Sequence, residues 1–251
     1  MKTQKRTRRK RTARKGKSDD MADEKVRAIV IKASDYKDDD KLVKLYTLER
    51  GRINAVMRGV KKPKAKLKMC AQVFCFGEYM LSKHGDFYTV TNCVIEETFF
   101  SLTADPDKFF AAAAVLELIN TSVHDAESNP ALFIQILKTM KQFLLPVNPE
   151  LVQLDFALKL LGVSGYSVRL DKCCACGNTR LKTRCFDMSL SGVVCGECAP
   201  VNAVSMSPLC HGILNLVVKT ETDRLGTLNF DANGVREALK LAKRLTEYVF
   251  G

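Results

Sequence analysis

The sequence predicts an α+β protein of more than one domain, in which a small N-terminal barrel is followed by a helical bundle with an inserted cysteine-rich segment. Three observations predict this fold class. β-Branched and aromatic runs fill residues 25–100, apolar residues then recur every three or four positions, and two C-x-x-C pairs separate two of the expected helices. A chain of 251 residues can bury the cores that such a fold needs.

Five runs rich in β-branched and aromatic residues predict the strands of the barrel. Several of them alternate apolar and polar residues, and Gly-rich or charged turns separate them. The runs are VRAIVIKA, KLVKLYTLERG, RINAVMRGV, AQVFCFGEYML (residues 71–81) and DFYTVTNCVIEE. Between the first two runs, DYKDDDK at residues 35–41 is expected to form an acidic loop.

Gly51 is the expected turning point between the second and third strands, because glycine adopts the left-handed backbone conformation without strain. The alternation that follows it places apolar side chains on one face of the third strand and polar ones on the other. The apolar set is Ile53, Ala55 and Met57, and the polar set is Arg52, Asn54 and Arg58.

Four local start signals predict helices beyond residue 100. Each consists of a capping side chain followed by a proline at the first helical position, where a missing N–H group costs nothing. The pairs are Asp105-Pro106, Asn129-Pro130, Asn148-Pro149 and Ser207-Pro208. Apolar residues at helical spacing follow each pair and recur in residues 234–250, which predicts a helical bundle.

These changes of pattern divide the chain into five parts. We expect a disordered basic tail at 1–24, the barrel at 25–100, the helical domain at 101–168 and 203–251, and a zinc-finger insertion at 169–202. No run of apolar residues is long enough for a membrane span, and the charged N-terminus does not resemble a secretory signal, so we expect a cytoplasmic protein without a membrane partner.

The basic tail carries most of the positive charge. Residues 1–20 hold ten Lys and Arg against two acidic residues, which accounts for +8 of the net +12. With almost no apolar residues to bury, this segment is expected to be disordered. Two interpretations stay open: a nonspecific phosphate clamp, or an extension upstream of a natural start at Met21.

The two C-x-x-C pairs predict a structural zinc ion bound by four thiolates. Cys173 and Cys176 are separated by 18 residues from Cys195 and Cys198, which lies within the spacing of four-cysteine zinc sites. Four thiolates complete a tetrahedron and leave no position for a catalytic water. A register that uses Cys174, a redox dithiol and a segment without ligand stay open as alternatives. Phe186 and Val193–Val194 are the expected core of this insertion.

The same region argues against an enzyme. A zinc deaminase needs a His-x-Glu or Cys-x-Glu ahead of its C-x-x-C pair. Glu197 follows Cys195 at that spacing, but no further C-x-x-C comes after it, and neither His84 nor His124 has a Glu two positions on. The sequence also lacks a phosphate-binding G-x-x-x-x-G-K and a nucleophilic G-x-S-x-G motif.

A cation-rich stretch, RGVKKPKAKLK, predicts a phosphate-binding loop on the barrel. The expected DNA contacts are Arg52, Arg58, Lys61, Lys62, Lys64, Lys66 and Lys68. Small barrels hold single strands by combining such a cationic surface with aromatic rings that stack on bases. The candidates for stacking are Phe74, Phe76, Tyr79, Phe87 and Tyr88. Lysine contacts to phosphate set affinity and salt dependence, not base sequence.

The order of these parts resembles the RecO family of bacterial DNA repair proteins. The resemblance runs from about residue 25 to the C-terminus and is carried by the T-x-E-x-G turn at 47–51, by GVKKPKAK, and by CxxCG followed by SGVVCxxC. It implies an oligonucleotide/oligosaccharide-binding (OB) barrel of five strands, a helical domain and a zinc lobe. The N-terminal tail departs from the family pattern.

The resemblance also implies a function. Members of this family are non-enzymatic recombination mediators that bind single- and double-stranded DNA, anneal complementary strands, and act with RecR to load RecA on DNA covered by single-strand-binding protein. Lys159 and Arg169, which flank an apolar helix, are candidates for binding the acidic tail of single-strand-binding protein, with solvated charge as the alternative. An RNA- or ribosome-associated zinc protein that uses the basic tail stays open as a second function, and a zinc deaminase as a remote third.

Overall fold

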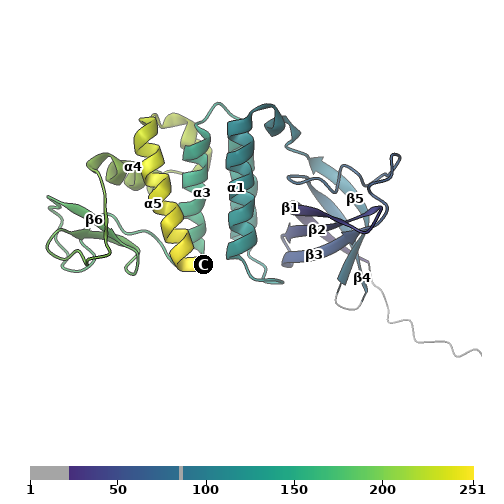
Figure 1. Cartoon of the computed structure of the whole chain (residues 1–251), viewed down its shortest axis with the longest axis horizontal. Helices are drawn as coiled ribbons and strands as arrows, with labels where there is room; N and C mark the ends of the chain where they lie inside the picture. The colour runs from purple at the N-terminus through teal and green to yellow at the C-terminus, as the bar shows by residue number, and fades with distance from the viewer. Residues whose placement is uncertain (1–22, 85–86) are drawn as a thin grey trace, which may run out of the picture.

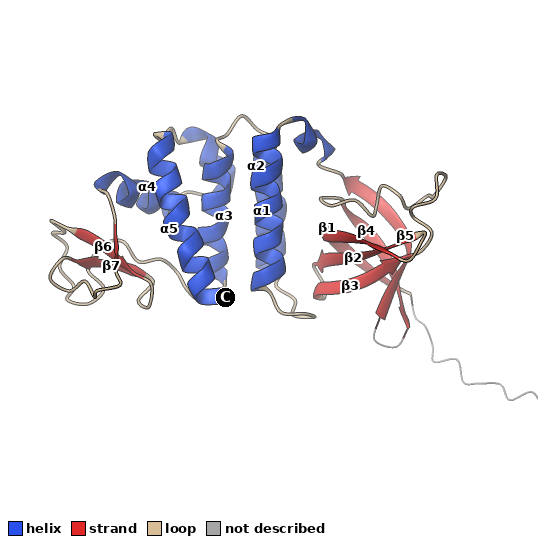
Figure 2. Cartoon of the chain, in the orientation of Figure 1, coloured by secondary structure: helices blue, strands red, loops and turns tan. Residues whose placement is uncertain are grey.

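The computed structural model describes residues 23–84 and 87–251. A helical bundle lies between a β-barrel on one side and a small three-stranded sheet on the other (Figure 1; Figure 2). The predicted disorder of the basic tail concerns residues that lie outside the described ones, apart from Asp23 and Glu24. Among the described helices, none combines the length and the apolar character that a membrane crossing requires.

Five strands close into the predicted barrel. They are β1 (Glu24–Tyr36), β2 (Asp40–Thr47), β3 (Gly51–Met57), β4 (Phe76–His84) and β5 (Phe87–Glu97). The order around the barrel is β1-β2-β3-β5-β4, with β3 parallel to β5 and all other neighbours antiparallel. A closed five-stranded barrel fits the OB architecture and confirms that part of the expected fold class.

The start predicted for the fourth strand, at residue 71, is wrong. Residues 71–75 form turns, and β4 begins at Phe76. Ala71 and Cys75 are nevertheless buried in the barrel core. Their apolar character therefore reflects packing against the barrel interior and not strand pairing.

The alternation predicted along β3 is confirmed. Ile53, Ala55 and Met57 are buried in the barrel, while Arg52 and Asn54 are half-buried. Gly51 has a φ of +63°, as the turn requires. A side chain at this position would also collide with the backbone carbonyl of Glu127, so glycine allows the barrel and the helical bundle to approach closely.

All four predicted helix starts are confirmed. A short 3₁₀ helix, η1 (Phe100–Ala104), leads into α1 (Pro106–Ser122), α2 (Pro130–Phe143) and α3 (Pro149–Val163); after the sheet come α4 (Pro208–Lys219), η2 (Thr222–Thr227) and α5 (Ala232–Phe250). At each of the four starts the side chain before the proline accepts a hydrogen bond from a backbone N–H of the first turn.

The cysteine-rich lobe, residues 169–202, lies between α3 and α4 in the chain. It contains β6 (Arg184–Asp187) and β7 (Gly192–Cys195), which pair with each other; β8 (Val204–Ser205), just after the lobe, pairs with β6. Phe186, Val193 and Val194 are fully buried, which confirms them as its core.

One hydrophobic cluster connects the three parts. It begins on the outer side of the barrel at Ile29 and Tyr46, continues through the helices, and reaches Phe186 in the cysteine-rich lobe. Tyr46 stacks on Phe133 of α2 at 6.4 Å between ring centroids. A second cluster fills the barrel interior. The barrel therefore packs on the bundle through an apolar surface of its own.

Candidate nucleic-acid interface and metal centre

The basic loop, residues 58–75, connects β3 to β4 as a series of tight turns. Backbone hydrogen bonds link Lys62 to Gly59, Ala65 to Lys62 and Lys68 to Ala65. Val60, Cys70 and Ala71 are buried in the barrel core and fix the two ends of the loop. The contacts predicted on this loop are all exposed: Arg58 just before the first anchor, and Lys61, Lys62, Lys64, Lys66 and Lys68 between the two ends.

The acidic loop predicted at residues 35–41 is confirmed only for residues 37–39, which form the turn between β1 and β2; residues 35–36 and 40–41 are paired in those strands. The acidic residues around this turn contact the start of the basic loop. The ammonium of Lys61 lies 3.0 Å from the Asp35 carboxylate, and that of Lys62 lies 3.5 Å from Asp39. The Asp40 carboxylate accepts a hydrogen bond from the Gly59 N–H at 2.8 Å. Negative charge therefore supports the near end of the loop.

The far end of the loop forms no such pair with any residue that the structure describes. Among the described residues, no carboxylate forms an ion pair with Lys64, Lys66 or Lys68. The charge of this end is therefore available to an anionic partner.

The structure does not place Arg52 with these cations. Its guanidinium pairs with Asp125 at 2.6 Å and donates to the backbone carbonyl of Asn120, at the end of α1 and the segment after it. Only 17% of its side chain is exposed. Lys44 donates to the side chain of Asn120 as well. Arg52 thus joins the barrel to the helical bundle.

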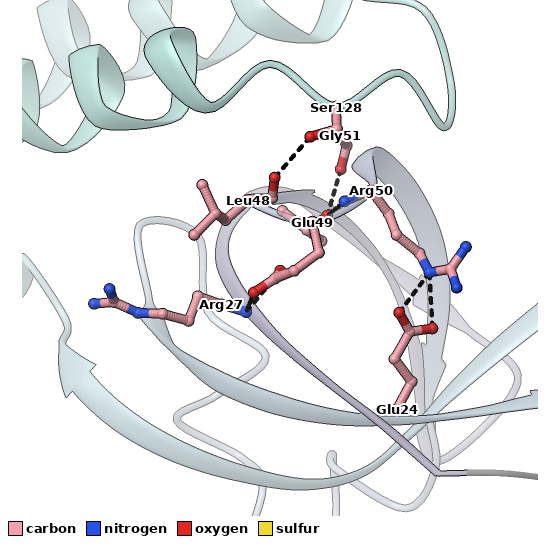
Figure 3. Close-up of polar contacts among 8 residues, drawn as sticks. Glu24, Arg27, Leu48, Glu49, Arg50, Gly51 and Ser128 are labelled. Atoms are coloured by element: carbon pink, nitrogen blue, oxygen red, sulfur yellow. Dashed lines mark hydrogen bonds and ion pairs between the residues drawn. The ribbon is translucent and has the colours of Figure 1, made fainter.

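The T-x-E-x-G sequence forms a closed turn at the same junction (Figure 3). The Thr47 hydroxyl accepts a hydrogen bond from the Arg50 N–H and donates to the Gly51 carbonyl. The backbone N–H of Arg27 donates a hydrogen bond that is shared between both oxygens of the Glu49 carboxylate, which ties the turn to β1. Ser128, after α1, donates to the carbonyl of Leu48 at 2.8 Å. The motif shapes the contact with the bundle.

Most of the candidate aromatic side chains for base stacking are buried. Phe74, Phe76 and Tyr79 are at most 7% exposed, so these three candidates are not available to stack on bases. Phe87 is 62% exposed, and Tyr88 is half-buried with the Lys83 ammonium 5.9 Å from its ring centre. Sequence reasoning missed Tyr36, which is 41% exposed; its position within DYKDDDK was the available signal.

The four cysteines of the two C-x-x-C pairs converge in the cysteine-rich lobe. The sulfur atoms of Cys173, Cys176, Cys195 and Cys198 all lie within 4.8 Å of one another. The sulfurs of Cys176 and Cys195 are 3.9 Å apart, close to the ~3.8 Å edge of a tetrahedron with metal–sulfur bonds of ~2.3 Å. This donor set fits a soft or borderline cation such as zinc. The group could therefore hold a metal ion.

Backbone hydrogen bonds favour the thiolate form of Cys173. The N–H of Cys195 donates to the Cys173 sulfur at 3.3 Å. Burial raises the pKa of Cys173, but backbone hydrogen bonds from Cys176, Cys195 and Ala175 outweigh it and lower the pKa to about 6. The side chain of Cys174 lies outside the cluster, 4.0 Å from the carbonyl of Arg169.

Lys159 and Arg169 are both held by backbone carbonyls. Lys159 donates to the carbonyls of Val218 and Thr220, and Arg169 donates to that of Leu190 at 2.6 Å. Each side chain therefore connects two parts of the chain.

Comparison with known proteins agrees with this architecture. The family model "Recombination protein O N terminal" matches residues 21–99, and "Recombination protein O C terminal" matches residues 103–250. The chain belongs to the RecO family. It is 32% identical to the DNA repair protein RecO of Clostridium novyi over 85% of this chain and 83% of that protein. The RecO proteins of Desulfitobacterium hafniense strain DCB-2 (32%; 88% and 82%) and Clostridium perfringens (28%; 88% and 91%) are similar over most of their lengths. Membership of the RecO family assigns the chain to DNA repair and recombination.

Proposed function

We propose that this chain is a recombination mediator that binds single- and double-stranded DNA on its barrel and promotes annealing of complementary strands. The observation that carries the proposal is the exposed cationic series Arg58–Lys68 on a loop anchored to an OB-like barrel. Neutralised phosphates and a surface that holds two strands are sufficient for annealing, because base pairing supplies the energy. The protein itself needs no catalytic group for this role.

The loop cations contribute in two ways. Lys64, Lys66 and Lys68 meet phosphate directly, since no described carboxylate competes for them. Lys61 and Lys62 meet phosphate only when their pairs with Asp35 and Asp39 loosen. Such exposed pairs are worth about 0–1 kcal/mol each, so a polyanion displaces them readily.

A zinc ion in the four-cysteine group has a structural role in this proposal. The residues that hold it are Cys173, Cys176, Cys195 and Cys198. Four thiolates occupy the whole tetrahedral shell, so the ion would stabilise the lobe and activate no water. The small buried core around Phe186 is consistent with a lobe that depends on metal for part of its stability.

The RecO family suggests the partners. We propose that the chain acts with RecR and single-strand-binding protein in the bacterial cytosol, and that RecA benefits indirectly when it is loaded on the coated strand. Lys159 and Arg169 are not the basis of this proposal, since both are engaged within the chain.

The proposal is tested by reversing charge on the loop. In the variant Lys61→Glu, Lys62→Glu and Lys64→Glu, binding to single-stranded DNA should weaken, and its dependence on log salt should flatten by about 0.7 for each phosphate that is no longer neutralised. The matched control reverses three exposed cations on α5, Lys240, Lys243 and Arg244. Equal weakening in the two variants would contradict the assignment of the loop.

Two further measurements separate the alternatives. Competition between single-stranded DNA and structured RNA should favour DNA, and a clear preference for RNA would support a ribosome- or RNA-associated protein instead. A strand-annealing assay should give similar rates for the full chain and for a form that starts at Met21. A large drop in rate for the shorter form would assign DNA binding to the basic tail.

A further inference from the structure

A cavity of about 560 Å³ opens on the outer face of the barrel, beside the basic loop. Its size lies in the range of pockets that take small molecules, roughly 300–1,000 Å³. The lining side chains that carry the argument are Tyr36, Leu42, Val56, Arg58, Phe87 and Thr89. They come from four of the five strands and the start of the loop.

Strand pairing explains why these side chains share one face. Leu42 pairs with Val56, and Val56 pairs with Thr89, so the three form a row across β2, β3 and β5. Tyr36 pairs with Asp40, which is two residues before Leu42 on β2, and Phe87 is two residues before Thr89 on β5. Both aromatic residues therefore lie on the same face as the row. The row forms an outward surface of the barrel wall, bordered by the two aromatic side chains.

Both aromatic rings are unusually accessible. Tyr36 is 41% exposed and Phe87 is 62% exposed, whereas Phe74, Phe76 and Tyr79 of the same barrel are buried. Two cations lie beside them: Arg58 lines the cavity, and the Lys37 ammonium is 5.3 Å from the centre of the Tyr36 ring. Asp40 also lines the cavity, and its carboxylate accepts a hydrogen bond from the Gly59 N–H. Apolar faces bordered by cations match a nucleotide, which joins a flat base to a phosphate.

We propose that this cavity binds one unstacked base of a single-stranded nucleic acid, against Tyr36 and Phe87, with Arg58 on the adjoining phosphate. A duplex offers no free base face, so the cavity distinguishes single from double strands. The loop lysines bind phosphate in both. This inference rests on the proposed function and adds to it the residues that select single strands.

The test compares two DNA forms on ring-deleted variants of the full chain. Tyr36→Ala combined with Phe87→Ala should weaken binding of an oligothymidylate by about 5- to 150-fold, the range expected when one base stack is removed. Binding of a duplex of equal length should stay within about twofold, and the salt dependence should not change, because every phosphate contact is retained. Tyr36→Phe, which keeps the ring, should bind like the unmodified chain.

A control pair removes exposed rings elsewhere. Phe110 and Tyr248 lie on α1 and α5 and are 70% and 61% exposed, so Phe110→Ala with Tyr248→Ala should leave binding of both DNA forms unchanged. An abasic oligonucleotide should bind the unmodified chain as weakly as oligothymidylate binds the ring-deleted variant. Thermal unfolding checks that every variant is folded.

The outcomes separate the two proposals. If the unmodified chain binds neither DNA form, the proposed function fails. Suppose instead that the unmodified chain binds both DNA forms. If the ring-deleted variant then retains single-strand binding, or loses affinity for single and double strands equally, the proposal that the cavity binds a base is overturned. The assignment of the loop to phosphate binding still stands in that case. Equal affinity for abasic and thymidylate strands also overturns the cavity.

Discussion

Asp155 provides the sharpest test of the energetics of the helical core. It is fully buried on α3, where Oδ2 accepts a 2.7 Å hydrogen bond from the Thr222 hydroxyl and Oδ1 has no partner. The Thr222 hydroxyl in turn accepts a hydrogen bond from Gln135. Burial raises the pKa of Asp155 to about 6, even though the Thr222 hydrogen bond and the charge of Lys159 favour the ionised form. We therefore predict that Asp155→Asn removes a pH-dependent cost of folding.

The magnitude follows from the two pKa values. In the unfolded chain Asp155 titrates near its ordinary value of 3.8, and in the folded chain at about 6. As the pH rises between these values, the unfolded chain releases the proton while the folded chain retains it, so the wild-type chain loses stability. At about 1.4 kcal/mol per pH unit the decrease is roughly 1.5 kcal/mol by pH ~5 and roughly 3 kcal/mol above pH ~7.

The assay is urea unfolding of both proteins at several pH values from about 5 to about 8. The difference in unfolding free energy, Asp155→Asn minus wild type, should grow by about 1.5 kcal/mol across this range. Any constant cost of the new amide group cancels. Glu247→Gln, which changes an exposed carboxylate on α5, should show no such growth. A flat difference for Asp155→Asn, or one that shrinks with pH, would refute the reasoning.

Three other predictions concern the metal, the domain junction and the acidic turn. Elemental analysis should find about one zinc per chain. A strong chelator, or the substitution Cys176→Ser, should make the cysteine-rich lobe sensitive to protease while the barrel stays resistant. Unchanged resistance of the lobe would argue against a structural ion. Arg52→Ala should lower the unfolding free energy by about 1–3 kcal/mol without changing the salt dependence of DNA binding. Arg58→Ala should instead reduce the slope of log affinity against log salt by about 0.7 on single strands. A reduced slope for Arg52→Ala and an unchanged slope for Arg58→Ala would place Arg52 on the DNA-binding surface. Asp35→Asn combined with Asp39→Asn should tighten single-strand binding severalfold at low salt and have little effect at high salt, because these carboxylates compete with DNA for the loop lysines. Fluorescence anisotropy measures the affinity. Weaker binding would mean that the acidic turn shapes the loop more than it competes with DNA.

Local chemistry explains which parts of the fold could be predicted from the sequence. Each X-Pro pair marks a helix start with groups that lie within one turn, so no long-range information is needed. The cysteine spacing works similarly, because two tight turns with two thiols each have few arrangements other than convergence on one metal. The φ of Gly51 could be predicted for the same reason.

The role of Arg52 could not be read in this way. Alternation correctly directs Arg52 of β3, and Arg58 just after β3, away from the barrel interior. It does not distinguish a surface in contact with solvent from one in contact with another domain. The first half of this face meets the helical bundle, and only the second half is free. That division depends on contacts between residues some 70 positions apart.

The aromatic side chains illustrate a second limit. Phe74 and Phe87 both lie in runs rich in aromatic and β-branched residues, but their environments differ. Phe74 packs against α1, whereas Phe87 is exposed at the start of β5. Phe74 lies within a turn, with a φ of +74°, and its ring packs against Phe109 of α1. Backbone geometry of this kind is set by the closed barrel and is not visible in a short window of sequence.

The apolar contact between barrel and bundle limits how the molecule can move. Tyr46 and Phe76 both lie against Phe133, and the polar contacts around Arg52 flank them. A barrel cut away from the helices would expose these rings to water and tend to aggregate. Within the intact chain, the barrel should therefore not rotate freely relative to the helices. A protein that binds the helices would also orient any DNA strand that is bound to the barrel.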